Sequence, residues 1–219
     1  MALGPPRRFA TALAPPVLYA VLVCWLTWPL AAHLSTDLPA PKAACRSDPL
    51  QLAWVLSYQS HRLVTAPARF YDANIYHPTP HALFYGEAGF GALPLFLPTF
   101  LASGNPTLAL NVLFLSAIAL TALVVHLIVH AWTHSGLAGG IAAWIFLTSR
   151  WVTGEAAATP NAVVLFYLPI IVLLASAPRP SLSTSLLLVA LIVLQGASGV
   201  DIAIALLALV GLLAGCHLL

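Results

Sequence analysis

The amino-acid sequence predicts an all-α membrane protein, a polytopic transmembrane helical bundle. Of its 219 residues, 61% are hydrophobic and only 6% are charged, and the mean hydropathy is +0.96. A soluble domain carries about 25% charged residues. Several apolar runs approach or exceed the ~20 residues needed to cross a bilayer. The runs show no strand-length alternation, so we expect helices rather than the strands of a barrel.

We expect about six spans in a single membrane domain of residues 1–219. The first span covers residues 10–34, and Pro15-Pro16 delays or kinks its start. An external loop with interfacial helices follows, over residues 35–103. Its last part, 89–103, is too short to span and contains prolines, which predicts an interfacial or re-entrant segment.

The other five spans follow this loop. Asn105-Pro106 is a helix start signal, with a capping side chain and then proline at the first helical position. Isolated polar residues and glycines within these spans are expected to serve helix–helix contacts, among them Asn111, Ser116, Gly136, Gly139 and Gly140. The predicted spans cover residues 106–131, 136–149, 161–177, 182–196 and 200–219.

The charges outside the spans predict the orientation. Arg7 and Arg8 precede the first span and place the N-terminus in the cytoplasm, so the loop 35–103 is external. A cleaved leader is the alternative for this region, but its apolar run is long and Ala31-Ala32-His33 is a poor cleavage site. We therefore expect a multi-pass protein of the cell inner (cytoplasmic) membrane, in contact with membrane lipid.

Eight of the fourteen charged residues lie in one window, between the first span and the rest of the chain. The net charge is only +2 and no Lys/Arg cluster suits a phosphate backbone, so no nucleic-acid partner is expected. A membrane protein that concentrates its ionisable groups in one loop has a candidate site there. The eight residues are Asp37, Lys42, Arg46, Asp48, Arg62, Arg69, Asp72 and Glu87.

Two parts of this loop carry candidate chemistry. In Ser47-Asp48-Pro49, Asp48 is either a plain helix cap or a carboxylate held at the interface as a base or metal ligand. The segment 70–87 is rich in aromatics, which suits a membrane interface. An interface does not explain its polar residues Asp72, Asn74, His77 and Glu87.

Three histidines recur every four residues, at positions 126, 130 and 134, and share one helix face. Such a row is able to bind a metal or relay protons. We favour a helix end, where histidine suits the C-terminal dipole.

Several short motifs follow one another along residues 17–175. They are Trp28-Pro29-Leu30, His33-Leu34, Ser47-Asp48-Pro49, Asp72-Ala73-Asn74-Ile75-Tyr76-His77-Pro78, Tyr85-Gly86-Glu87 and Gly104-Asn105-Pro106. Their order resembles the N-terminal half of bacterial GT-C-type glycosyltransferases, which use a sugar carried on a polyprenyl phosphate.

The resemblance implies roles for individual residues. Asp48 matches the catalytic first-loop Asp, as base or metal ligand. Glu87 and Glu155 are the further candidate ligands of a divalent metal ion, whose identity stays open. Positive charge on the departing phosphate would come from the arginines. The candidate residues for binding substrate and phosphate are Arg46, Arg62, Arg69, Arg150, Asn74 and His77.

Two other functions stay open. The chain is shorter than full members of the family and lacks the histidine expected near Glu155. Both points favour a non-catalytic subunit of a larger membrane complex, derived from the same fold and partnered by other membrane subunits. A transporter is the third candidate, but it would need charged or broken helices at mid-membrane depth.

Overall fold

The computed structural model describes residues 5–39, 47–86, 89–157, 163–175, 181–199, 204–208 and 211. Within these residues all regular secondary structure is helical and none is a strand, which confirms the all-α prediction. The main helices are α1 (Pro5–Leu26), α2 (Ser47–Thr65), α3 (Leu93–Ser103), α4 (Pro106–Thr133), α5 (Gly136–Leu147), α6 (Tyr167–Ala175) and α7 (Leu182–Gly196). The short helical turns are η1 (Leu30–Ala32), η3 (Pro67–Arg69), η4 (Ala82–Tyr85), η5 (Phe90–Ala92) and the π-helix η6 (Trp151–Glu155).

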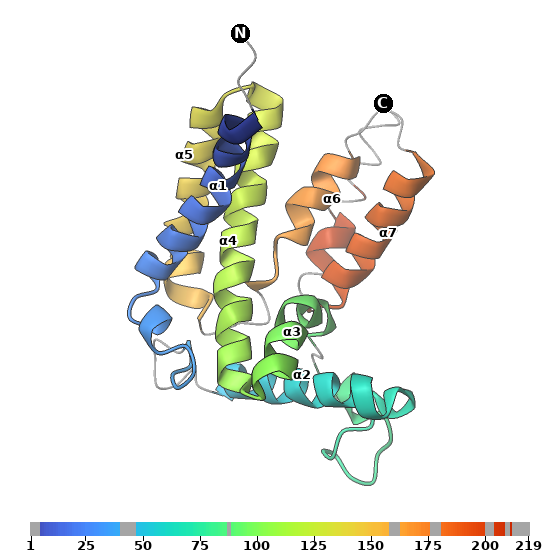
Figure 1. The fold of residues 1–219 in the computed structure, drawn as a ribbon. Helices are drawn as coiled ribbons and strands as arrows, with labels where there is room; N and C mark the ends of the chain where they lie inside the picture. Colours follow the sequence, from blue (N-terminus) through green and yellow to red (C-terminus); the bar gives the residue numbers. More distant parts are fainter. Residues whose placement is uncertain are drawn as a thin grey trace.

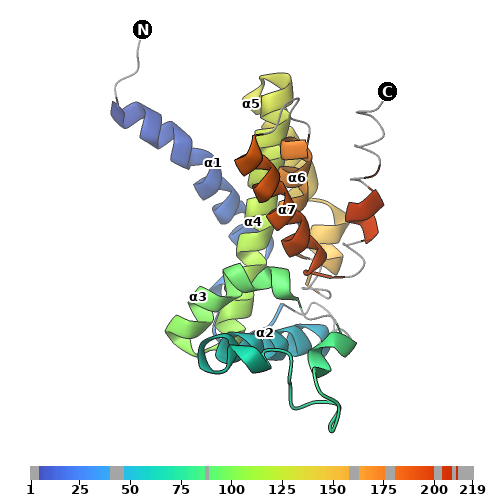
Figure 2. The same cartoon turned by 90° about the vertical axis from the view of Figure 1, so that its right-hand side faces the viewer.

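Helix α4 is the centre of the molecule and contacts α1, α2, α3, α5 and α6 (Figure 1). Helices α1 and α5 lie along one side of it, and α6 pairs with α7 on the other side. Helix α2 lies across one end of α4, close to perpendicular to it. Both views place α2 and the loop after it at the opposite end of the molecule from the start of α1 (Figure 2).

The start and end of α4 follow from local chemistry. Asn105 Oδ1 accepts a hydrogen bond from the Leu108 N–H at 3.0 Å, and Pro106 occupies the first turn, as the sequence predicts. The helix ends where His134 takes the left-handed conformation, with φ of 53°. Its 28 residues give a length of about 42 Å. In the described part of the chain, α4 is the one helix long and apolar enough to cross a bilayer by itself.

The other described helices do not meet both the length and the apolar composition of a span, so a six-span bundle is not confirmed. Helix α1 ends at Leu26 instead of residue 34, because Pro29 has no N–H to continue the helix. Helix α5 has 12 residues and α6 has 9, while α7 has the predicted bounds 182–196. Of the predicted sixth span, only residues 204–208 and 211 are described, and they are helical.

The histidine row lies at the end of α4 that is far from α2. Tyr19 Oη on α1 lies 2.6 Å from His126 Nδ1, and the rings of His126 and His130 are 6.3 Å apart. The described residues contain no group of three or more His, Cys, Asp or Glu side chains placed to hold a metal ion. His126 therefore joins α1 to α4 by a hydrogen bond.

Gly139 brings α5 into close contact with α4. A Cβ at this position would lie 2.6 Å from the His126 carbonyl oxygen and 3.2 Å from its ring. By contrast, a Cβ at Gly136 or Gly140 would meet nothing within 4 Å, so close approach is confirmed only for Gly139.

We predict that Gly139→Ala lowers the free energy of unfolding by about 1–3 kcal/mol, as overpacking does elsewhere. Thermal unfolding of the purified protein in detergent measures the effect. Gly140→Ala makes the same change of helix propensity on the same helix without the contact, and is expected to leave the melting temperature unchanged or raised. Equal melting temperatures for the two variants would contradict the close approach.

Candidate functional site

Asp48 lies in the first turn of α2, at the end of the helix nearest α4 (Figure 1). The helix starts at Ser47, two residues before Pro49, where a cap at Asp48 would start it, so Asp48 is inside the helix rather than its cap. Its carboxylate is exposed, and the Ser47 hydroxyl donates a hydrogen bond to its Oδ1 at 3.0 Å. A carboxylate in a first turn is stabilised by the helix dipole. Asp48 is therefore both suited to the helix start and accessible to a ligand.

Arg62 lies on the same helix but far from Asp48. It follows by fourteen residues, which at 1.5 Å per residue is a separation of about 21 Å. Its Nε donates a hydrogen bond to Tyr58 Oη at 2.9 Å, and its guanidinium stands over the Tyr58 ring. The structure thus does not bring Arg62 and Asp48 together around one small ligand.

The loop after α2 is organised around Asp72. Its Oδ1 accepts a hydrogen bond from the His81 N–H at 2.9 Å, and His81 Nδ1 lies 3.0 Å from the same oxygen. The Asp72 carbonyl accepts a hydrogen bond from the Tyr58 hydroxyl, and the rings of Tyr71 and Phe84 stack at 4.2 Å. These contacts give Asp72 a structural role that the sequence did not indicate.

The other candidate residues of this loop are exposed. Asn74 and His77 lie in the turn that the Asp72–His81 contact closes, and Arg69 ends η3. Arg69 follows the end of α2 by four residues, and the loop with Asn74 and His77 is joined to the middle of α2, where the Tyr58 hydroxyl donates to the Asp72 carbonyl. Of these candidate residues, Arg62 is therefore the one whose separation from Asp48 the helix fixes.

The remaining candidates are described only in part. Arg150 precedes the π-helix η6 and is exposed. Arg46, Glu87 and the side chain of Glu155 lie outside the described residues. Of the three candidate metal ligands, only Asp48 is therefore placed, and we derive no step through a metal ion.

A cavity of about 300 Å³ lies just after α1, where the first loop (35–103) meets the second loop, the stretch between the predicted spans 136–149 and 161–177. The first loop contributes Asp37, and the second loop contributes Thr153 of η6. Thr27 and Trp28, which follow α1, also line the cavity. The other lining residues are Leu26, Pro29, Leu30, Leu38, Pro39, Phe114, Val152 and Ala157.

Asn111 of α4 and Asn105, the cap of that helix, hold the segment 33–37 in place. Asn111 is fully buried, and its Nδ2 donates to the carbonyl oxygens of Leu34 and Asp37, both at 2.7 Å. Asn105 Nδ2 donates to the Ser35 carbonyl at 3.0 Å. The predicted helix–helix role of Asn111 is thus wrong, because it binds the loop. Its effect is to fix the backbone of Asp37 beside the cavity.

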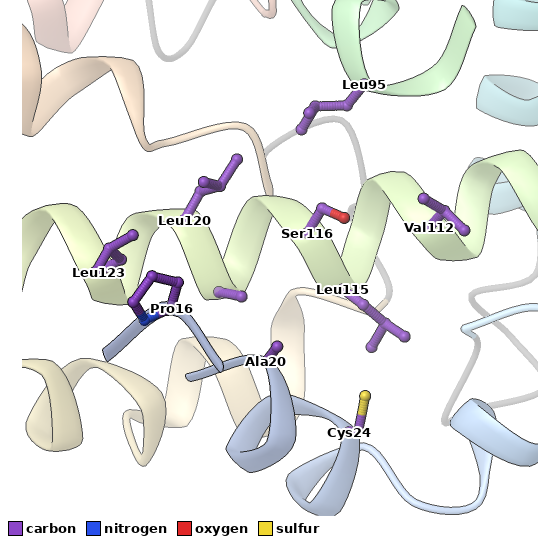
Figure 3. Close-up of a pocket in the computed structure, with 10 residues that line it drawn as sticks. Pro16, Ala20, Cys24, Leu95, Val112, Leu115, Ser116, Leu120 and Leu123 are labelled. Carbon is purple, nitrogen blue, oxygen red and sulfur yellow. The ribbon is translucent and has the colours of Figure 1, made fainter. Parts of the chain in front are cut away.

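A second, apolar groove of about 460 Å³ runs between α1 and α4 (Figure 3). Pro16, Ala20 and Cys24 line it from α1, and Leu95 lines it from α3. Ser116 is the polar side chain among the α4 residues that line it. The small residues of α1 leave this space, which suits hydrocarbon chains.

The sequence did not single out Asp37 as a site residue. The available signal was its position as the first acidic residue after the predicted first span. The catalytic role was instead assigned to Asp48, because of its motif Ser47-Asp48-Pro49. The sequence gives no signal for Thr27 and Thr153, because these residues come together only in the folded protein.

Comparison of the chain with protein-family models, with curated proteins and with solved structures finds no match. The resemblance to GT-C-type glycosyltransferases therefore rests on the motifs in the sequence.

Proposed function

We propose that the chain is a multi-pass membrane protein of the GT-C kind, which transfers a sugar from a polyprenyl phosphate at the end of the molecule that holds α2. The observation that carries the proposal is the shared cavity of the first and second loops. In the family that the sequence resembles, those two loops supply the acidic residues of the active site. Here Asp37 comes from the first loop and Thr153 from the second.

The exposed apolar surface supports the membrane part of the proposal. Large apolar side chains face outward on α1, α5 and α7, where water would disfavour them and lipid would not. Examples are Val17, Val21, Ile141, Ile145, Leu186 and Val193. The crosswise position of α2 suits a helix at the membrane interface. Arg7 and Arg8 belong to the start of α1, at the opposite end of the molecule from α2. By the positive-inside rule, the end of the molecule that holds α2 is then the external one.

The chemistry that we propose needs one base and positive charge. Asp48 accepts the proton of the acceptor hydroxyl as that oxygen attacks the sugar carbon and the bond to the phosphate breaks. Arg150 is the described arginine nearest the second loop in sequence, and we assign it to the departing phosphate. Arg62 is about 21 Å away along α2, so we place it outside this step.

We predict that Asp48→Asn lowers the rate of transfer by about 10²–10⁴-fold, the usual contribution of a general base. The assay measures transfer from a panel of polyprenyl-phosphate-linked hexoses and pentoses by protein reconstituted in proteoliposomes. Asp72→Asn is the matched control, because it removes a first-loop carboxylate that is bound to His81. An undiminished rate in the Asp48 variant would refute the catalytic assignment.

A non-catalytic subunit is the second candidate, and one observation favours it. The predicted phosphate-binding residue Arg62 lies about 21 Å from Asp48 along α2, whereas an active transferase needs phosphate and base at one centre. Purification in mild detergent distinguishes the candidates. Stoichiometric co-purification of other membrane proteins, with no transfer from any donor of the panel, would support the subunit.

A further inference from the structure

We propose that the cavity beside Asp37 is a subsite for one monosaccharide unit, which it binds through the hydroxyl groups of the sugar. The inference rests on the proposed function and goes beyond it, because it separates a sugar-binding group, Asp37, from the base Asp48.

The hydrogen-bonding character of the lining points to a ligand that donates hydrogen bonds. The Thr27 hydroxyl donates to the Val23 carbonyl at 2.8 Å, and the Thr153 hydroxyl donates to the Ser149 carbonyl at 3.0 Å. With their protons committed, both oxygens are left as acceptors. The Asp37 carboxylate is also an acceptor when it is ionised. These three side chains favour the hydroxyl groups of a sugar and disfavour a phosphate.

The remaining lining suits the carbon face of a sugar ring. The Trp28 side chain is 68% exposed in the whole molecule and borders the cavity. Its ring offers a flat apolar surface with an N–H at one edge. Leu30, Leu38 and Phe114 complete the apolar part. A volume of about 300 Å³ is at the small end of ligand pockets, which fits one sugar unit rather than an oligosaccharide.

The backbone that carries the Asp37 side chain is held in place. Asn111 binds the Asp37 carbonyl at 2.7 Å, and the Asp37 N–H donates to the His33 carbonyl at 3.0 Å. The next residue, Leu38, packs against the hydrophobic core, and Pro39 is buried. The backbone of Asp37 is therefore fixed on both sides, and preorganisation of this kind lowers the entropy lost when a ligand binds.

A bare cation is a poorer match to this cavity. Ca²⁺ takes about six to eight oxygen ligands and Mg²⁺ takes six in an octahedron. The described lining offers one carboxylate and two hydroxyl groups beside an indole ring. A polyhydroxylated ring uses both the acceptors and the apolar wall.

The test measures binding of methyl glycosides of common hexoses and pentoses to the full chain in lipid nanodiscs, by saturation-transfer NMR. Nanodiscs avoid detergents with sugar headgroups, which would occupy the site. We expect saturable binding of at least one glycoside, weakened about tenfold or more by Asp37→Asn and by Trp28→Leu, as expected for loss of ~1.4 kcal/mol. Asp72→Asn is the matched control and should bind as the unmodified protein does.

Equal binding by the Asp37 and Asp72 variants would overturn the proposal, as would the absence of binding to the unmodified protein. If Asp37→Asn fails to fold, Thr153→Val keeps the test open, because it removes an acceptor at a mostly exposed position. Protein that transfers sugar but binds no glycoside refutes the subsite alone. Protein that binds a glycoside through Asp37 but transfers nothing refutes the proposed function alone.

A competition experiment tells the two sources of the sugar apart. Displacement of the bound glycoside by a polyprenyl-phosphate-linked sugar supports a donor subsite. Retention of the glycoside under saturating donor supports an acceptor subsite. Displacement by polyprenyl phosphate without a sugar would overturn the proposal, because it would show that the cavity binds phosphate.

Discussion

Replacing Gly91 with alanine is expected to separate α7 from η5 and to destabilise the protein more than Gly139→Ala does. A Cβ on Gly91 would lie 2.1 Å from the Leu194 carbonyl oxygen and 2.1 Å from Ser198 Oγ. The carbonyl belongs to the backbone of α7 and cannot turn away, so the helix itself must move. Overpacking costs about 1–3 kcal/mol and occasionally more, and this contact is shorter than that at Gly139.

The loss extends beyond the steric contact. The Gly91 carbonyl accepts a hydrogen bond from the buried Tyr167 hydroxyl at 3.1 Å, and the Gly91 N–H donates to the Ala197 carbonyl at 3.4 Å. Displacing η5 breaks both, and a buried polar group left without a partner costs about 1–3 kcal/mol. Thermal unfolding of purified protein measures the sum.

Gly86→Ala is the matched control for this prediction. It lies in the same loop, a Cβ there would meet nothing within 4 Å, and its φ of −149° suits any residue. Its melting temperature should stay close to that of the unmodified protein. A Gly91 variant that melts with the control would show that the junction between η5 and α7 does not form.

Replacing Asn111 with leucine is expected to have the second largest effect. The substitution keeps a side chain of similar size but leaves the Leu34 and Asp37 carbonyl oxygens without their donor. Each of the two carbonyl oxygens costs about 1–3 kcal/mol. The substitution also removes the buried Asn111 Oδ1, which has no partner among the described residues, so we expect a net loss of roughly 2–4 kcal/mol. We also expect weaker binding of methyl glycosides, because Asp37 loses its position at the cavity.

Two measurements check this prediction. Thermal unfolding reports the stability, and protease digestion of the segment 33–37 reports its release from α4. Ser116→Ala is the control on the same helix, since Ser116 lines the apolar groove between α1 and α4. Unchanged glycoside binding in a folded Asn111 variant would show that Asn111 does not determine the position of Asp37.

The elements that the sequence predicts well are those with local signals. Asn105-Pro106 marks the start of α4, and Ser181 caps α7, where its side chain accepts a hydrogen bond from the Thr184 N–H. The predicted first span was too long because hydropathy alone does not register the break at Pro29. The π-helix η6 has no simple sequence pattern.

The candidate site was predictable in part, for the same reason. The position of Asp48 at a helix start and the short apolar segment 89–103 before α4 follow from local motifs. The position of Asp37 depends on Asn111, which is 74 residues further along the chain, and the structural role of Asp72 depends on contacts with Tyr58 and His81. The arginines shared a charged window in sequence, but the length of α2 separates Arg62 from Asp48.

The junction at Gly91 also sets an order for biosynthesis. Gly91 contacts Tyr167, Leu194, Ala197 and Ser198, so its partners leave the ribosome long after it does. Until then the turn η5 has neither the Tyr167 hydroxyl nor the end of α7 to bind. Helices α1 and α4, and the loop that Asn111 holds, have all their residues available earlier. The chain is thus able to assemble the surroundings of Asp37 first and to close the α7 side last.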